Sequence, residues 1–378
     1  MSGAAIESHQ DASSTDPPRA RASDARASDA DTAPVAHGGD IEAARRLFPD
    51  APQPFLDLST GINPLPYPLP PLRPELFIAL PSASALTQLL ANAAQAYGAA
   101  STAHVVAAPG TQIMLAQVAA LVRPGRAAVL APTYAEHARA AALAGHRVVE
   151  VADIADLSSA DLAVVVNPNN PDGRIAAREA LLACARALPA GALLVVDEAF
   201  MDVAPPGTSL AGDVGSGNIV VLRSFGKFFG LAGLRLGFAL AHPATAARLS
   251  TVLGPWAVGG AAIAIGTAAL ADRAWAAATR AQLAQAALRL DAILAGAGLA
   301  IVGGTPLFRL ARTPAAGELF NHLGRAGILV RRFAEEPTWL RFGLPAGEPG
   351  WERLAAAMGG FSPGLMRPEQ DMALPSRI

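Results

Sequence analysis

The stretch LAVVVNPNNP, residues 162–171, decides the fold, because five apolar residues run directly into a turn of asparagine and proline. Short apolar runs bounded by turn residues are typical of strands that are buried on both faces of a sheet. Similar runs occur before and after this one, with helix-like stretches between most of them. The predicted strands span residues 127–130, 148–151, 162–166, 193–196, 219–222 and 236–240, and the predicted helices span 112–122, 134–143 and 178–188. This alternation indicates an α/β fold with a mostly parallel sheet covered by helices on both faces.

Polar motifs lie at the ends of three of the predicted strands. NPNNPDG (167–173) follows one strand, DEAF (197–200) ends the next, and SFGK (224–227) follows a third. Each motif alone is a weak signal, because it is compatible with a turn, a helix cap or a surface charge. Ligands of parallel α/β sheets bind beyond the carboxyl ends of the strands. We therefore expect the three motifs to meet at one site.

The composition excludes several classes of protein. Of the 378 residues, 52% are hydrophobic and 16% are charged, which permits a large buried core and excludes a chain that is disordered throughout. The formal net charge of -2 gives no electrostatic reason to expect a nucleic acid or a membrane as partner. Cys184 is the single cysteine, which excludes an intramolecular disulfide and a thiolate zinc cluster. We expect a cytoplasmic globular protein without a metal.

One apolar interval is long enough to cross a bilayer, since no charged residue lies between Arg248 and Asp272. The interval contains a Gly-Pro and a Gly-Gly pair, and much of it is alanine, which contributes little to membrane insertion. We therefore expect a buried helix or a subunit interface here, and no membrane span. Residues 1–34 also lack the apolar core of a signal peptide.

The chain is expected to form one large and one small folded domain between unstructured ends. The first residues are rich in Ala, Ser and Asp without apolar periodicity, which is typical of disorder. Residues 273–295 predict one long helix. The expected organisation is a tail at 1–33, an N-terminal arm at 34–79 that joins the small domain, a large domain at 80–250, an interdomain helix with the small domain at 251–361, and a tail at 362–378.

The order and spacing of the three motifs resemble those of the fold-type I pyridoxal-phosphate enzymes, specifically the class I/II aminotransferase superfamily. The resemblance covers about His37 to Phe361. It implies a large domain with a mostly parallel sheet flanked by helices, a smaller C-terminal α/β domain, pyridoxal 5'-phosphate as cofactor, and a homodimer.

The resemblance assigns cofactor contacts residue by residue. Lys227 matches the lysine that forms the Schiff base, Asp197 the acid that pairs with the pyridine nitrogen, and Asn170 the residue that hydrogen-bonds the ring hydroxyl. The remaining matches are Tyr134, which stacks on the ring, and the phosphate-binding residues Gly110, Thr111, Gln112, Ser224 and Arg235. These residue types suit the chemistry. A carboxylate keeps the ring nitrogen protonated, a desolvated lysine is a nucleophilic amine, and a helix N-terminus with a guanidinium binds a phosphate dianion.

Two branches of the superfamily are similar to this sequence. HGGDI (37–41), LDLSTGINP (56–64) and the phenylalanine that ends DEAF resemble the threonine-phosphate decarboxylases of cobalamin biosynthesis. That resemblance implies decarboxylation of L-threonine O-3-phosphate to (R)-1-aminopropan-2-yl phosphate and CO2. The alternative is a histidinol-phosphate-type aminotransferase. A third class, a non-catalytic regulator, would carry a helix-turn-helix module, for which residues 1–36 are too short and too polar.

Substrate contacts are implied by the same resemblance. Arg341 in WLRFG matches the arginine that binds the substrate α-carboxylate, and Arg331 matches the arginine that meets the substrate phosphate. His37 and Asn63 match residues that line the phosphate pocket. From the residues alone, Arg331 is also compatible with a surface charge and His37 with a turn cap.

Two positions depart from the superfamily pattern. Gly226 stands where many relatives have a Ser or Thr that bonds the cofactor phosphate. Leu80 stands where many have a tyrosine that reaches that phosphate across the dimer. Both changes remove an expected contact with the cofactor phosphate, so its binding should depend more on Ser224, Arg235 and the Gly110 turn.

Overall fold

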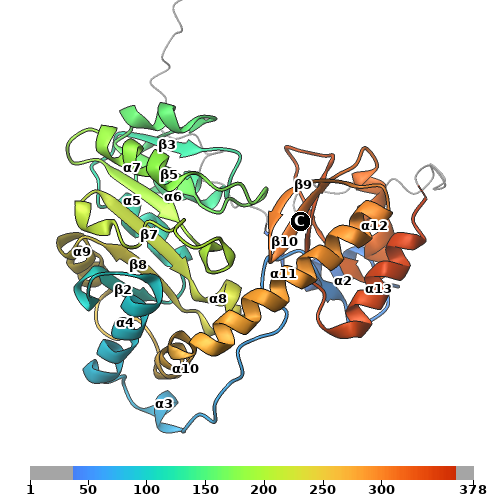
Figure 1. Ribbon diagram of the computed structural model, residues 1–378, viewed down its shortest axis with the longest axis horizontal. Coiled ribbons are helices and arrows are strands. Elements are labelled where there is room, and N and C mark those ends of the chain that lie inside the picture. The colour runs from blue at the N-terminus through green and yellow to red at the C-terminus, as the bar shows by residue number, and fades with distance from the viewer. Residues whose placement is uncertain (1–36, 363–378) are drawn as a thin grey trace, which may run out of the picture.

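The computed structural model describes residues 37–362. The predicted tail at 1–33 lies outside these residues, as does the predicted tail at 362–378 apart from its first residue. Figure 1 shows two parts of unequal size, connected by the long helix α11 (Arg273–Gly296) and by an N-terminal arm. Among the described residues, no helix is both long and apolar enough to cross a membrane.

The larger part is built on a seven-stranded sheet with the order β2-β8-β7-β6-β5-β3-β4. β8 is antiparallel to β2 and β7, and the other pairs are parallel. Its strands are β2 (Val105–Ala108), β3 (Arg126–Leu130), β4 (Arg147–Val151), β5 (Leu162–Val166), β6 (Leu193–Asp197), β7 (Ile219–Ser224) and β8 (Gly237–Ala241). All predicted strands are present, with ends shifted by at most two residues. β2 was not predicted, because its sequence VVAA is too short and too rich in alanine to stand out.

Helices cover both faces of this sheet, as the alternating pattern predicts. Buried side chains of α5 (Gln112–Ala119), α6 (Glu136–Leu143) and α9 (Pro243–Leu253) form one core cluster. Those of α4 (Ala83–Tyr97) and α7 (Arg178–Ala187) belong to the other cluster. α5 ends three residues before the predicted boundary, because the chain turns ahead of Pro124.

The uncharged interval contains α10 (Gly260–Ala271), which packs against α4 and the short helix α3 (Glu75–Ile78). α10 has buried residues along its length, as expected for a core helix. α11 then begins at Arg273 because the Asp272 side chain accepts a hydrogen bond of 2.9 Å from the Trp275 amide, an N-terminal cap. The apolar interval is therefore explained by packing within the larger part.

The smaller part contains a four-stranded antiparallel sheet with the order β12-β13-β10-β9. The smaller part is built from N-terminal and C-terminal segments together, because β1 (Leu56–Asp57) pairs in parallel with β11 (Ile328–Leu329) in a separate two-stranded sheet. Its other elements are α2 (Ile41–Leu47), β9 (Ala300–Thr305), β10 (Phe308–Arg312), α12 (Ala316–Arg325), β12 (Arg331–Arg332), β13 (Trp339–Gly343) and α13 (Gly347–Gly359).

The arm after β1 returns from the smaller part to the large sheet. The Asn63 amide donates to the Lys227 carbonyl (2.9 Å), and the Tyr67 amide donates to the Phe229 carbonyl (2.8 Å). Both acceptors lie in or directly after α8 (Phe225–Phe228), which follows β7. The arm thus ties the first described residues to the segment that carries Lys227. Short 3-10 helices complete the structure at Thr102–His104, Ile154–Ser159, Met201–Val203, Val214–Ser216 and Ala232–Leu234.

Candidate active site

The parallel register of the central strands aligns the predicted cofactor residues at one edge of the sheet. Val166 at the end of β5 pairs with Asp197 at the end of β6, and Asp197 pairs with Leu222 near the end of β7. The turn with Asn170 and the helix with Lys227 follow immediately. Motifs from three separate stretches of the sequence therefore meet at the carboxyl ends of the strands, where ligands of such sheets bind.

Lys227 is partly buried at this edge, and its surroundings favour the neutral amine. Desolvation by burial, together with the Arg341 and Arg235 guanidinium groups, lowers the pKa of Lys227 to about 8, and Asp197 opposes the shift. The Lys227 Nζ atom lies 5.9 Å from the centroid of the Phe200 ring. A neutral amine near physiological pH is the form that attacks a carbonyl group.

Asp197 is held by a histidine that we did not predict. The Asp197 carboxylate is 5% exposed; its Oδ2 lies 2.8 Å from Nε2 of the buried His137, and its Oδ1 accepts from the Ala199 amide at 3.0 Å. Since a carboxylate only accepts, His137 Nε2 carries the proton. His137 lies in the first turn of α6, after β3, so the only available sequence signal was a histidine soon after a predicted strand.

A turn between β2 and α5 forms a cradle of the kind that binds phosphate. Gly110 has φ +84°, and a Cβ there would lie 2.6 Å from Nη2 of Arg235. Glycine therefore allows the guanidinium to lie directly against the turn. Thr111 makes no side-chain cap to α5, which leaves the first amides of the helix to bind an anion. This pairing of helix N-terminus and arginine fits the phosphate of the expected cofactor.

Arg341 connects the smaller part to this site. It lies in β13 and is almost fully buried; its Nη1 donates to Asn170 Oδ1 and its Nη2 donates to the Ser59 carbonyl at 2.8 Å. Its buried Nε has no hydrogen-bond partner among the described residues. Burial and the nearby Arg331 lower the pKa of Arg341 to about 10, while Asp57 opposes the shift. A buried guanidinium with an unused donor fits a carboxylate ligand.

His37 and Arg331 line one small cleft together with Asp40, Phe320 and Arg332. The His37 ring lies 5.8 Å from the Tyr134 ring, so the cleft adjoins the place expected for the cofactor. Burial lowers the pKa of Arg331, and Glu335 and Tyr134 oppose this shift. The structure thus brings together two residues that are 294 positions apart in the sequence and were both predicted to meet the substrate phosphate.

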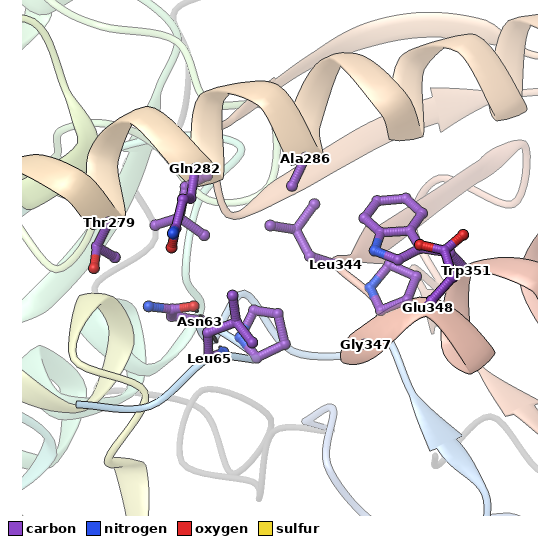
Figure 2. A pocket seen from close by; sticks show the side chains of 12 residues that line it. Asn63, Leu65, Thr279, Gln282, Ala286, Leu344, Gly347, Glu348 and Trp351 are labelled. Carbon is purple, nitrogen blue, oxygen red and sulfur yellow. Dashed lines mark hydrogen bonds between the residues drawn. The ribbon is translucent and has the colours of Figure 1, made fainter. Parts of the chain in front are cut away.

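Asn63 is engaged elsewhere in this structure. Its Nδ2 donates to the Phe228 carbonyl and its Oδ1 accepts from the Leu65 amide, both at 2.9 Å. Figure 2 shows Asn63 on the wall of a different cavity, of about 210 Å³, between the arm, α11 and α13. The amide therefore holds the turn of the arm, and its role toward a substrate phosphate stays a prediction.

The two positions that depart from the superfamily pattern, Gly226 and Leu80, differ in burial: Gly226 is closely packed and Leu80 is exposed. A Cβ at Gly226 would lie 2.8 Å from the Cα of Ala232, so the close approach of this backbone excludes a serine or threonine side chain. Leu80 is 68% exposed and lies on the arm side of α4. Gly226 therefore reflects tight packing behind Lys227.

Comparisons with known proteins show the family of this chain. The family model for class I and II aminotransferases matches residues 78–355. Threonine-phosphate decarboxylases from a Sinorhizobium species and from Pseudomonas aeruginosa are 44% and 43% identical, each over 86% of this chain and 98% and 97% of their own length. The crystal structure of a histidinol-phosphate aminotransferase from Sinorhizobium meliloti, with pyridoxal-5'-phosphate, has a TM-score of 0.71 at 24% identity and covers 85% of this chain and 93% of its own. The predicted fold class is confirmed.

Proposed function

Because this chain belongs to the class I and II aminotransferase family, we propose that it is a pyridoxal-phosphate-dependent lyase that decarboxylates L-threonine O-3-phosphate to (R)-1-aminopropan-2-yl phosphate and CO2. The observation that carries the proposal is the 43–44% identity, over 86% of the chain, to two proteins named threonine-phosphate decarboxylase. It favours this reaction over the histidinol-phosphate aminotransferase alternative, since a relative with that name is 37% identical over 62% of the chain. The product would enter cobalamin biosynthesis.

The residues at the sheet edge fit the cofactor. Bound pyridoxal phosphate supplies an electron sink for the substrate α-carbon. Lys227 would hold its aldehyde carbon, and Asp197, steadied by His137, would keep a proton at its ring nitrogen. Asn170 uses Oδ1 for Arg341, which leaves its Nδ2 to donate to the ring hydroxyl. Tyr134 would cover the ring, and the Gly110 turn with Ser224 and Arg235 would bind the phosphate.

Two anion sites at different ends of the substrate account for the choice of reaction. Arg341 would bind the α-carboxylate, and the cleft with His37 and Arg331 would bind the distal phosphate. Held at both ends, the substrate would be oriented with its carboxylate placed for loss as CO2, and the electrons of the broken bond would pass to the electron sink that the bound cofactor supplies. A tight contact between Arg341 and the carboxylate would by itself stabilise the bound substrate and oppose the loss of CO2. Binding energy from the distal phosphate contacts would offset this effect.

Lys227 is also the expected acid for the last proton transfer. After CO2 leaves, the α-carbon must be protonated, and the Lys227 amine is a titratable donor at this edge of the sheet. Its pKa of about 8 lies close to physiological pH, where a group gives and takes protons most effectively.

An exposed apolar surface on the larger part bears on the quaternary state of the protein. Phe77 and Ile78 in α3 and Leu80 directly after it are 68%, 82% and 68% exposed, and together they form an apolar surface, called here the apolar surface beside α3. Exposed apolar clusters of this kind mark contacts between proteins. We infer a cytoplasmic homodimer in which a second copy covers this surface.

The function is tested by incubating the purified holoenzyme with L-threonine O-3-phosphate, with and without 2-oxoglutarate. CO2 release that does not depend on 2-oxoglutarate is expected, with one aminopropanol phosphate formed per CO2. Glutamate formation from histidinol phosphate, without CO2 release from threonine phosphate, would establish the aminotransferase instead.

A further inference from the structure

Glu136 is a buried carboxylate next to the cofactor residues that has no assigned role. It is the first residue of α6 and is 5% exposed. Its Oε1 lies 3.0 Å from His37 Nε2, and its Oε2 accepts from Gln112 Nε2 at 2.9 Å and from Arg139 Nη1 at 3.3 Å. The carboxylate is thus surrounded by donors, and the N-terminal end of the helix adds further favourable potential.

The bonds of Glu136 set the direction of a hydrogen-bond chain toward the cofactor. Because an ionised carboxylate only accepts, Gln112 must turn its amino group toward Glu136. Its Oε1 then faces the Tyr134 hydroxyl, which donates to it at 3.0 Å. The two oxygens of Glu136 therefore fix the amide orientation of Gln112 and, through it, the hydroxyl direction of Tyr134.

The other bond of Glu136 leads to the substrate cleft. His37 Nε2 must carry a proton to donate to Glu136, and the bond holds a side chain that is 45% exposed. His37 lines the cleft with Arg331. An imidazole without this contact would be free to change its rotamer and lose its place beside the cleft, since the His37 side chain makes no other hydrogen bond among the described residues.

We propose that Glu136 is a positioning residue that holds His37 at the mouth of the cleft for the substrate phosphate. The inference rests on the proposed function of that cleft as a phosphate site. Two neighbouring residues of α6 would then have different roles. His137 holds Asp197, which is expected to contact the cofactor ring, and Glu136 holds His37, which is expected to contact the substrate phosphate.

Glu136→Gln is the sharpest test. Glutamine has the same shape but no charge, and its amino group can meet His37 Nε2 only if the imidazole moves its proton to Nδ1, so the charge-assisted donation from His37 is lost. For the holoenzyme we expect the KM for threonine phosphate to rise about tenfold and kcat to change less than threefold, the size of effect typical for one lost hydrogen bond. Affinity for inorganic phosphate, measured by calorimetry on the holoenzyme, should fall in parallel.

Matched variants separate positioning from a general structural role. Glu179→Gln changes an exposed glutamate in the first turn of α7 and should leave both constants unchanged. In a cycle with His37→Gln, the double variant should bind phosphate no more weakly than His37→Gln alone, because Glu136 acts through His37. If Glu136→Gln does not fold, Glu136→Asp keeps the charge with a shorter reach, and a smaller loss of phosphate affinity is expected.

The failure of this inference is distinct from failure of the proposed function. Unchanged phosphate affinity in the Glu136 variants, or effects of the two substitutions that multiply, would overturn the positioning role. Absence of CO2 from threonine phosphate with the unchanged enzyme would instead overturn the reaction, and the phosphate calorimetry would still decide the role of Glu136.

Discussion

At the scale of single residues, Lys227 has the property that its predicted role requires. Its pKa of about 8 lies below the ordinary value of 10.5, because burial and two guanidinium groups disfavour the charged form. Below pH 8 most of the amine is protonated and cannot attack an aldehyde. Above that pH most of it is neutral.

The pH dependence of cofactor capture follows directly. Covalent attachment of pyridoxal phosphate to the apoenzyme should speed up as pH rises to about 8 and then level off. Absorbance at the wavelength of the bound cofactor measures the rate, and Lys227→Ala, which should give no borohydride-reducible attachment, is the control. A rate that keeps rising toward pH 10.5 would show that the amine is not perturbed.

Gly226 shows how one missing side chain shapes the segment around Lys227. Gly226→Ala adds a Cβ 2.8 Å from the Ala232 Cα, so α8 and the following 3-10 helix must separate. We expect cofactor affinity to fall at least tenfold and the melting temperature to drop, since overpacking of a buried contact costs about 1–3 kcal/mol. Gly233→Ala is the matched control, because no atom lies within 4 Å of its added Cβ. Equal behaviour of the two variants in cofactor titration and thermal melting would contradict the steric explanation.

At the scale of elements, a buried ion cluster joins three segments beneath the site. Arg223 in β7 bonds Glu198 Oε2 at 3.1 Å and Asp202 Oδ1 at 2.5 Å, and its guanidinium carbon lies 4.3 Å from the centroid of the Tyr97 ring of α4. Burial raises the pKa of Glu198, and the Arg223 charge and hydrogen bonds oppose this effect. The arginine thus allows two carboxylates to remain inside the core.

Removal of this arginine should be costly. We expect Arg223→Ala to lower the free energy of unfolding by about 3–5 kcal/mol, because it leaves two buried carboxylates without their cation. Urea denaturation measures the loss. Arg178→Ala is the control, since Arg178 pairs with Asp213 in a more exposed place and should cost about 1 kcal/mol or less. Losses of similar size in the two variants would contradict the role of the buried cluster.

At the scale of the whole molecule, the apolar surface beside α3 bears on assembly. Ile78 is 82% exposed, so Ile78→Asp should leave the fold intact but place a charge in the proposed dimer contact. Analytical ultracentrifugation should show more monomer at micromolar concentration. Leu288→Asp, on the exposed face of α11, should not change the sedimentation. A variant at Ile78 that stays dimeric would place the subunit contact elsewhere.

Most strands of the large sheet could be predicted from the sequence because their signals are local. Apolar runs specify buried strands, and the register of parallel strands then carries Asp197 and the segments with Asn170 and Lys227 to the same edge. β2 escaped prediction because its four small residues resemble many other parts of an alanine-rich chain. His137 was missed because the turn after β3 gives no sign of which strand end its side chain will face.

The sequence by itself determined the α/β class and the positions of most strands in the large sheet, and it predicted which residues would hold the cofactor, because burial patterns and residue types act over short distances along the chain. Only the tertiary structure decided that Asn63 holds the arm, that Gly226 is required by close packing, and that Glu136 contacts His37 across 99 positions of sequence. Those relations arise where the arm, the small sheet and the large sheet pack together, and no local pattern records which side chains will meet there.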